Sequence, residues 1–288
     1  MIGIDWGTTS FRAWRLGADG TVLGARAAAR GILAVSDGGF AAALREQCGD
    51  WLAEGEDRVL LSGMIGSRQG WVETPYLPCP AGIEDLAAAL VAVPFPGAEI
   101  RLVPGLSARD GQDVPEVLRG EETQIAGLDF ADGLVCLPGS HSKWVRLEAG
   151  RVAGFETYFS GETFAALRSA TILGRMMGDG PTDLAAFDRG LGRAGDPGHL
   201  LHHLFGVRTL GLGGALAPAA SASYLSGLLI GHEVGAAMAA GARVTIVANA
   251  QLSPLYARAV AARGGVATLT SPDAAARGLA RIGARAWC

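Results

Sequence analysis

A short pattern that occurs twice constrains this chain more than any other feature. Setting Gly7 on Gly139 places Thr8 on Ser140, and in both places the turn stands between two apolar runs. Glycine lets a phosphate approach the backbone closely, and the N–H groups of such turns can hold an anion. The repeat predicts two similar α/β domains, each with a β-hairpin whose glycine- and hydroxyl-rich tip faces the other across a cleft.

Composition agrees with two folded domains and restricts the partners. The 288 residues are 49% hydrophobic and 18% charged, which is enough apolar material for full cores. The formal net charge is −4, without a basic excess that would attract nucleic acid or a polybasic patch that would bind a membrane. We therefore expect small molecules as partners.

The cysteines and the apolar segments indicate a cytoplasmic protein. Cys48, Cys79, Cys136 and Cys288 form no Cys-x-x-Cys pair, so reduced thiols are the simplest interpretation. The first apolar stretch contains charged residues and does not resemble a signal peptide. The uncharged segment 209–231 is long enough to span a membrane, but it is mostly small residues and contains a proline. We predict a linker followed by a buried helix there.

Periodicity and turn signals predict the order of the elements. Strands are expected at 2–5, 11–16, 21–23, 59–61, 100–103, 134–137, 143–147, 244–248 and 266–269. Helices are expected at 40–52, 83–93, 120–128, 160–176 and 253–264, with a last helix that opens at Ser271-Pro272. Ser160 is expected to cap its helix, with Glu162 in the first turn. The segment 110–115 is expected to be a loop.

Charged residues beside the two turns suggest a phosphate clamp. Asp5 ends the first strand and could hold Mg²⁺ through water, and Arg12 lies across the turn from it. An Asp in this position can instead bond the amides of its own turn. Lys143, the only lysine of the chain, follows the second turn. A compact ammonium differs from a guanidinium fork, so its retention is either functional or an accident of composition.

Two acidic residues and a group of histidines can each have either a functional or a structural role. Glu121 and Glu122 stand at the start of a helix, where a carboxylate could accept a proton from an attacking hydroxyl or simply favour the helix dipole. His199, His202 and His203 have the spacing of metal ligands on a helix, but a solvated helix start is the favoured interpretation. No P-loop sequence is present.

Six motifs taken together resemble one family. In chain order they are Asp5-Trp-Gly-Thr-Thr-Ser-Phe-Arg12, Ser62-Gly-Met-Ile-Gly66, Arg119-Gly-Glu-Glu-Thr-Gln124, Leu137-Pro-Gly-Ser-His-Ser-Lys-Trp-Val145, Ser160-Gly-Glu162 and Leu225-Ser-Gly-Leu-Leu-Ile-Gly231. The ordered set, which covers nearly the whole chain, resembles the 2-dehydro-3-deoxygalactonokinases. These are sugar-acid kinases of the actin/hexokinase/Hsp70-like superfamily.

The resemblance implies an α/β fold of two ribonuclease-H-like lobes around a nucleotide cleft that holds ATP. The N-terminal lobe would span residues 1–118 and the C-terminal lobe residues 119–271, with a last helix at about 272–288 packing back on the first lobe. The ATP phosphates would lie against one turn formed by Gly7, Thr8 and Thr9 and another formed by Gly139, Ser140 and His141. The adenosine segment would contain Asn249 and Ala250, where the superfamily usually has glycine.

The resemblance also implies the reaction. MgATP would phosphorylate the C6 hydroxyl of 2-dehydro-3-deoxy-D-galactonate, a step in galactonate catabolism. Asp5 would hold the metal, Arg12 and Lys143 would offset charge, and Glu121, or else Glu122, would be the base. The sugar acid would be bound by residues near the second and third motifs and by the start of the 160–176 helix. These are Gly63, Met64, Arg68, Arg119 and Glu162.

Two rival functions share the same expected fold. One is an exopolyphosphatase or pppGpp phosphohydrolase, which also combines a Gly-Glu-Glu-like segment with a phosphate hairpin. The other is a non-metabolic actin-like ATPase, either a filament former or an activator of another enzyme. A filament needs extensive additional surfaces, and an iron–sulfur activator needs paired cysteines that the sequence does not obviously provide. Self-association into a homodimer is an open alternative.

Overall fold

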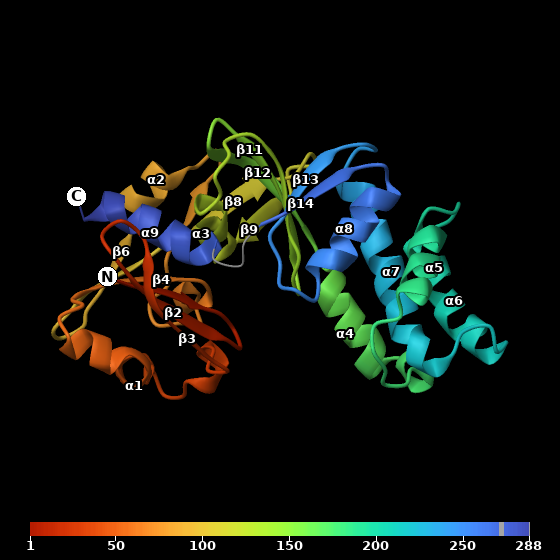
Figure 1. Cartoon of the computed structure of the whole chain (residues 1–288), viewed down its shortest axis with the longest axis horizontal. Helices are drawn as coiled ribbons and strands as arrows, with labels where there is room; N and C mark the ends of the chain where they lie inside the picture. Colours follow the sequence, from red (N-terminus) through yellow and green to blue (C-terminus); the bar gives the residue numbers. More distant parts are fainter. Residues whose placement is uncertain (271–273, 288) are drawn as a thin grey trace. The chain divides into compact units, whose positions relative to one another are not determined.

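The computed structural model describes residues 1–270 and 274–287, and its contacts divide the chain into two compact units (Figure 1). The first unit contains Met1–Asp132, Arg146–Phe155 and the described part of the C-terminal segment. The second unit contains Gly133–Val145 and Glu156–Thr270. The first unit therefore extends past residue 118.

The first unit is built on a six-stranded sheet with the order β3-β2-β1-β4-β7-β6. Its strands are β1 (Ile2–Trp6), β2 (Phe11–Leu16), β3 (Val22–Ala28), β4 (Arg58–Ser62), β6 (Val91–Val93) and β7 (Glu99–Leu102). The first three strands form an antiparallel meander, and β4 and β7 run parallel to β1. The helices are α1 (Phe40–Ala53), α2 (Ile83–Ala88), α3 (Glu121–Ala126) and α9 (Ala274–Ala286), with 3-10 turns η1 (Ile32–Ala34) and η2 (Met64–Gly66).

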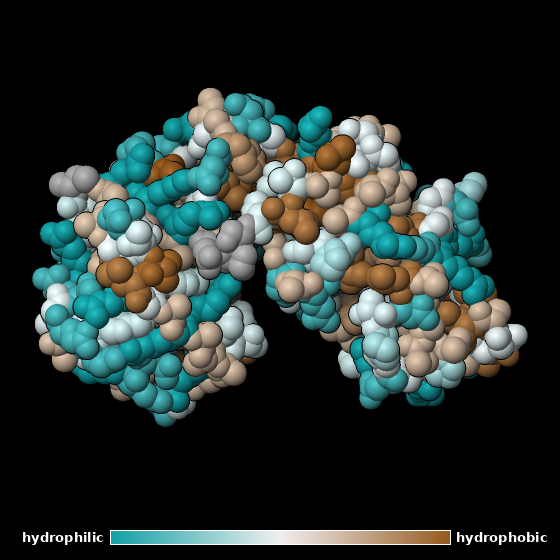
Figure 2. Space-filling view, viewed as in Figure 1, coloured by the Kyte–Doolittle hydropathy of each residue, from teal (hydrophilic) through white to brown (hydrophobic). Residues whose placement is uncertain are grey.

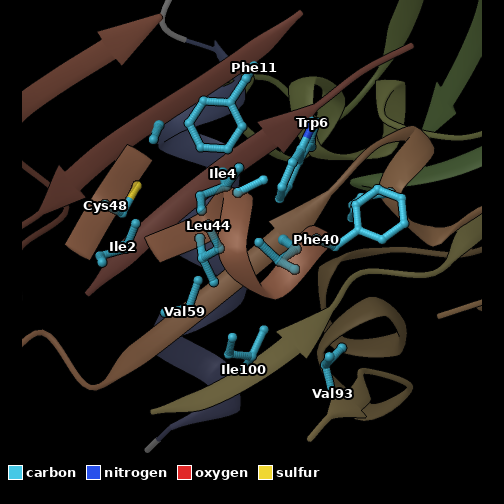
Figure 3. Packing of buried hydrophobic residues seen from close by; sticks show 14 of the residues in the cluster. Ile2, Ile4, Trp6, Phe11, Phe40, Leu44, Cys48, Val59, Val93 and Ile100 are labelled. Atoms are coloured by element: carbon cyan, nitrogen blue, oxygen red, sulfur yellow. The ribbon is translucent and has the colours of Figure 1, made fainter. Parts of the chain in front are cut away.

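Strand β1 has a different neighbour on each face because its side chains alternate. Ile2, Ile4 and Trp6 are fully buried in the core that α1 covers, as Figure 3 shows. On the opposite face, a Cβ added to Gly3 would lie 3.2 Å from the Cβ of Leu279 in α9. The alternation therefore directs Asp5 away from the α1 core.

One predicted helix in the first unit was wrong at its C-terminal end, and a small sheet was missed. The expected helix 83–93 ends at Ala88, because Val91–Val93 pairs antiparallel with β7 as β6. The loop predicted at 110–115 is present at residues 110–114, and it joins two strands that the sequence analysis missed. These are β8 (Gly105–Arg109) and β9 (Pro115–Leu118), which form a three-stranded sheet with β5 (Tyr76–Pro78).

A second sheet repeats the strand order of the first. Its order is β12-β11-β10-β13-β14, which corresponds to β3-β2-β1-β4-β7 in chain sequence. The strands are β10 (Gly133–Leu137), β11 (Ser142–Glu148), β12 (Arg151–Tyr158), β13 (Arg243–Ile246) and β14 (Val266–Leu269). The prediction of two similar α/β units is confirmed, and the two turns predicted to match are the connections β1–β2 and β10–β11.

Five helices complete the second unit. They are α4 (Ser160–Ala170), α5 (Leu184–Ala194), α6 (Leu200–Leu212), α7 (Pro218–Ala237) and α8 (Ser253–Ala262). Helices α5 and α7 pack closely because glycines remove the side chains between them. A Cβ on Gly227 would lie 2.0 Å from the carbonyl oxygen of Phe187, and a Cβ on Gly190 would lie 2.1 Å from that of Tyr224. The buried helix expected in 209–231 is α7, but residues 209–212 end α6.

Helix α4 differs from its prediction at both ends. Phe159 is the N-cap residue and Ser160 is the first helical residue, so Ser160 does not cap the helix. The helix ends at Ala170, and only the 3-10 turn η3 (Gly174–Met176) follows before residue 176. The Ser271-Pro272 start of the last helix lies outside the described residues.

Figure 2 shows one face of the molecule, on which both units carry a mixture of hydrophilic, intermediate and hydrophobic residues. Hydrophobic residues on the face drawn in Figure 2 lie in small clusters between hydrophilic ones. Within residues 1–270 and 274–287, no helix combines the length and the apolar character needed to cross a membrane.

Candidate active site

The β1–β2 turn places a carboxylate beside a guanidinium. Asp5 and Arg12 are register partners across the hairpin, and an Arg12 Nη donates to Asp5 Oδ2. Burial raises the pKa of Asp5, while the charge of Arg12 opposes that shift. The turn itself is closed by a hydrogen bond of 2.8 Å from the Gly7 N–H to the Ser10 carbonyl. Asp5 therefore bonds Arg12 rather than the amides of its own turn, among the interactions described.

The chain supports the predicted phosphate residues of this turn from behind. Leu33 donates its N–H to the Thr8 carbonyl at 3.2 Å, and a Cβ on Gly31 would lie 2.3 Å from Thr8 and Thr9 backbone atoms. Thr8 and Thr9 are exposed. Backbone packing thus holds the turn in shape while its hydroxyl side chains face solvent.

Two glycines bring the start of α3 to the ends of β1 and β4. Gly63 follows β4 with φ 90°, and Gly120 precedes α3 with φ 106°. A Cβ on Gly120 would lie 3.3 Å from the Cα of Gly63, and a Cβ on Gly63 would lie 3.0 Å from Asp5 Oδ1. The absence of both side chains therefore allows the Asp5 carboxylate and the Glu121–Glu122 pair to share one region of the first unit.

The two predicted base candidates have different environments. Glu122 is 1% exposed, and its Oε2 accepts the Gly120 N–H at 2.6 Å. Its Oε1 is buried without a hydrogen-bond partner among the described residues. Burial, and secondarily the charge of Glu121, raise the pKa of Glu122 to about 8. Glu121 is partly exposed and its Oε2 accepts the Arg119 N–H at 3.1 Å. A carboxyl that stays protonated at neutral pH cannot accept a proton, so the environment favours Glu121 as a base.

Three predicted substrate residues line one hollow in the first unit. Met64, Arg68 and Arg119 surround a cavity of about 370 Å³ together with Tyr76. The Arg119 guanidinium bonds both the hydroxyl and the carbonyl of Thr74 and lies 4.3 Å from the centre of the Tyr76 ring.

The two arginines of the hollow differ in exposure. The Arg68 side chain is 87% exposed and its Nε lies 3.1 Å from Glu73 Oε1. Arg119 is therefore held as a wall of the hollow, whereas Arg68 can reorient toward a ligand.

In the second unit, the start of α4 packs on the β10–β11 turn. Glu162 donates its N–H to the Ser140 carbonyl at 2.9 Å. A Cβ on Gly161 would lie 2.3 Å from the Gly139 carbonyl oxygen, so only glycine permits this approach. The second predicted phosphate turn and a helix N-terminus therefore form one structural piece, with the helix dipole adding positive potential.

His141 and Glu162 interact with each other at this place. His141 Nε2 lies 2.6 Å from Glu162 Oε2, and the imidazole stacks on Phe159 with 4.9 Å between ring centres. Glu162 was predicted from sequence as a sugar-acid ligand. The structure pairs it with His141 in the β10–β11 turn of the second unit, whereas the hollow lined by Arg68 and Arg119 is in the first unit.

Lys143 is almost buried at the start of β11. It is 6% exposed, and its Nζ donates to Thr157 Oγ1 at 2.9 Å. Ser142 and Trp144 point to the opposite face of the strand because side chains alternate. Lys143 is therefore not an ordinary surface lysine.

A cavity of about 370 Å³ lies beside the second turn. Gly139 and Ser140 form part of its wall with the first residues of α4, and α7 and α8 supply most of its apolar lining. Asn249 and Ala250, predicted to bind adenosine, are not among its lining residues. Asn249 instead accepts the N–H groups of Gln251 and Leu252 at 3.0 and 2.9 Å, and these two residues do line the cavity.

Helices α7 and α8 contribute residues that the sequence analysis missed. Ser223, Ser226 and Tyr256 line the cavity, and Glu233 accepts hydrogen bonds from Trp144 Nε1 and Tyr256 Oη at 2.9 and 2.8 Å. A sequence signal existed for Glu233, because it is the only Asp, Glu, Lys or Arg in the 20 residues of α7.

Of the three histidines at the start of α6, His199 and His202 are exposed, as expected for a solvated helix start, and only His203 differs from that prediction. His203 is fully buried and its Nδ1 lies 3.0 Å from Nε2 of His232 in α7. In the described part of the chain, no three His, Cys, Asp or Glu side chains gather as a metal site. A single carboxylate such as Asp5 fits Mg²⁺, which usually keeps waters and phosphate oxygens as its other ligands.

These features define a class of protein. Two units share one strand order, each has a glycine- and hydroxyl-rich turn after its first strand, and a cavity of small-molecule size adjoins one turn. Two α/β units with this repeated strand order form the actin-like ATPase fold. The chain belongs to the 2-keto-3-deoxy-galactonokinase family, whose model matches residues 5–282.

Relatives and solved structures agree with this family. The chain is 36% identical to "Probable 2-dehydro-3-deoxygalactonokinase DgoK1" of Rhizobium meliloti (strain 1021), over 99% of this chain and 96% of that protein. It is 34% identical to the 2-dehydro-3-deoxygalactonokinase of Escherichia coli (strain K12), over 95% and 94% of the two chains.

A crystal structure from Sinorhizobium meliloti, assigned as a 2-dehydro-3-deoxygalactonokinase, is similar with a TM-score of 0.88 at 36% identity. That likeness covers 99% of this chain and 97% of that one. The activator of 2-hydroxyisocaproyl-CoA dehydratase from Clostridium difficile shares the fold alone, with a TM-score of 0.53 at 12% identity over 99% and 94% of the chains.

Proposed function

We infer that this protein is an ATP-dependent sugar-acid kinase that phosphorylates 2-dehydro-3-deoxy-D-galactonate. The acceptor would be the C6 hydroxyl, and the product the 6-phosphate, as a step of galactonate catabolism in the cytoplasm. The observation that carries this inference is the family match from residue 5 to 282 together with full-length relatives of that name.

The second unit would bind the nucleotide. Its cavity has an apolar lining suited to adenine and ribose, and Gly139 and Ser140 at its wall offer backbone N–H groups for phosphate oxygens. We extend the adenosine site from Asn249 and Ala250 to the adjoining Gln251 and Leu252, which reach the cavity. Lys143 would hold positive charge near the phosphates.

The first unit would bind the sugar acid and would supply the carboxylate that holds the metal ion. Asp5 would hold Mg²⁺, and the ion would offset the negative charge of the phosphates. Gly7, Thr8 and Thr9 present a turn for phosphate, and Arg12 keeps the Asp5 carboxylate oriented through their ion pair. Glu121 would accept the proton of the C6 hydroxyl as that oxygen attacks the γ-phosphorus, while the bond from the γ-phosphorus to the bridging oxygen breaks and ADP leaves.

The hollow beside Glu121 would hold the sugar acid. The substrate carries a carboxylate and a 2-keto group, and a guanidinium binds a carboxylate through two parallel hydrogen bonds. Arg68 would make that contact by leaving Glu73, while Arg119 and Met64 shape the wall. The amide of Gly63 adds a donor at the end of β4.

The thiols argue against the iron–sulfur activator among the rivals. Burial raises the pKa of Cys48 to about 12 and raises that of Cys136 well above its ordinary value. Both side chains are fully buried, whereas a cluster shared by two subunits needs cysteines at the surface.

Substrate-dependent ATP consumption tests the function directly. Purified protein is incubated with MgATP and a panel of 2-keto-3-deoxy acids that includes the galactonate and gluconate epimers, and 6-phosphate formation is followed. We expect turnover that requires the sugar acid and is highest with the galactonate form. Hydrolysis of polyphosphate or pppGpp without any sugar acid would support the phosphohydrolase instead.

A further inference from the structure

Glu233 is a buried carboxyl that touches no surface of the nucleotide cavity yet bonds several residues around it. It is 2% exposed on the inner face of α7. Its Oε1 accepts from Trp144 Nε1 at 2.9 Å and its Oε2 accepts from Tyr256 Oη at 2.8 Å. The hydroxyls of Ser160 and Ser142 also hydrogen-bond to it.

The partners of Glu233 come from three separate segments. Ser142 and Trp144 begin β11 directly after the phosphate turn, Ser160 is the first residue of α4, and Tyr256 lies in α8. Ser160 and Tyr256 line the cavity, and Ser142 Oγ lies 2.9 Å from Tyr256 Oη. One carboxyl thus ties together the turn, the helix that packs on it and the helix on the other side of the cavity.

The backbone of the Gly139–Lys143 turn packs directly against the start of α4, so neither can move without the other. The Glu162 N–H bonds the Ser140 carbonyl at 2.9 Å, and Gly161 admits no side chain against Gly139. A shift of α4 or of β11 would therefore move the amides that face the phosphates. Preorganised donors bind charge better than mobile ones, because ordering them on binding consumes free energy.

Stability alone does not account for a carboxyl in this place. Burying a carboxyl costs free energy that hydrogen bonds only partly return, and apolar residues of similar size often serve stability as well or better. Burial indeed raises the pKa of Glu233, opposed by its hydrogen bonds from Ser160, Trp144, Tyr256 and Ser142.

We propose that Glu233 is a positioning residue for nucleotide binding, which fixes the Gly139–Lys143 turn and the start of α4 through Ser142, Trp144, Ser160 and Tyr256. The proposal rests on the proposed function in assigning the cavity to the nucleotide. Glu233 touches neither substrate, and its effect reaches ATP only through its partners.

The test compares Glu233→Met with Glu233→Gln. Methionine removes both acceptor oxygens, whereas glutamine keeps one acceptor oxygen and gains N–H groups that can donate to a neighbouring hydroxyl oxygen. We expect Glu233→Met to raise the KM for ATP and the Kd for ADP roughly tenfold or more, with the KM for the sugar acid unchanged. Glu233→Gln should restore most of the affinity. The matched control is Ser221→Ala on the same helix, whose buried hydroxyl bonds only the Ala217 carbonyl at 3.0 Å among the contacts described.

Further measurements separate the proposal from a purely structural role and from the function itself. Thermal unfolding is recorded for each variant, and Tyr256→Phe, which keeps the ring and removes the linking hydroxyl, replaces Glu233→Met if that variant does not fold. A lower melting temperature with unchanged ADP affinity in every variant would overturn the proposal. ADP binding by calorimetry needs no sugar acid, so failure of the wild type to phosphorylate the sugar acid would reject the proposed function and leave this test standing.

Discussion

Gly63 and Gly120 lie backbone against backbone, so that a Cβ on Gly120 would stand 3.3 Å from the Cα of Gly63. Both residues have positive φ, 90° and 106°, a region that side chains disfavour. This contact joins the end of β4 to the start of α3. It sets where Glu121 stands relative to Asp5 in the first unit.

Gly120→Ala should therefore impair both stability and activity. The strained backbone costs roughly 1–3 kcal/mol, and relieving it moves the start of α3 away from Gly63. We expect kcat to fall at least roughly tenfold, because the base is displaced from the acceptor. The control is Gly111→Ala, where an added Cβ meets nothing within 4 Å. Equal kcat values in the two variants would contradict the role of this contact.

Glu121→Gln should abolish most turnover while nucleotide binding persists. Removing a general base typically slows the chemical step by roughly 10²–10⁴-fold. ADP affinity measured by calorimetry should stay near the wild-type value, because the cavity of the second unit is unaltered. Glu148→Gln is the matched control, since Glu148 forms an exposed ion pair with Arg146. Normal turnover in Glu121→Gln would show that Glu121 is not the general base, so that either Glu122 accepts the proton or the reaction needs no general base.

Glu122 should make stability depend on pH with a defined sign. Its pKa is about 8 in the folded protein against an ordinary value of 4.5, so the folded state holds the proton longer. Its contribution to stability is full below pH 4.5 and is lost as pH rises toward 8, at roughly 1.4 kcal/mol per pH unit.

Urea unfolding at pH 5, 7 and 9 measures this contribution. As pH rises, the free energy of unfolding of the wild type should fall relative to that of Glu122→Gln. Parallel curves for the two proteins would show that Glu122 titrates normally.

Lys143→Arg should lower turnover although the charge is kept. The lysine is nearly buried against Thr157, and a planar guanidinium neither fits that space nor replaces a compact ammonium. We expect a loss of roughly 10²-fold in kcat, the size seen when one donor that stabilises developing charge is removed. Arg146→Lys, at an exposed position of the same strand, serves as the control. Full activity of Lys143→Arg would make the single lysine an accident of composition.

Arg68→Met should weaken the sugar acid selectively. A hydrogen bond to a charged group contributes roughly 1.5–3 kcal/mol, which corresponds to a rise of about 10–100-fold in KM for the sugar acid. The KM for ATP should not change. A shorter analogue that lacks the carboxylate should be phosphorylated equally slowly by wild type and variant. If Arg68→Met binds the sugar acid normally, Arg119 becomes the carboxylate ligand.

The sequence alone was sufficient for the doubled hairpin and for the family. Turns of Gly, Thr and Ser between alternating strands are local features, because the side-chain period and the turn residues act over a few neighbouring positions. The same reasoning failed where pairing partners are distant. The local sequence predicts Val91–Val93 as the end of an Ala-rich helix, but in the structure these residues form a strand because they pair with β7.

Tertiary structure decided which polar residues surround each site. Arg68 and Arg119 are 51 positions apart in numbering, yet they line one hollow, and Glu233 meets Trp144 across 89 positions. Burial and hydrogen bonding depend on which elements pack together, which no local pattern records. The same packing separates two adjacent glutamates, because it buries Glu122 as a carboxylic acid and leaves Glu121 accessible.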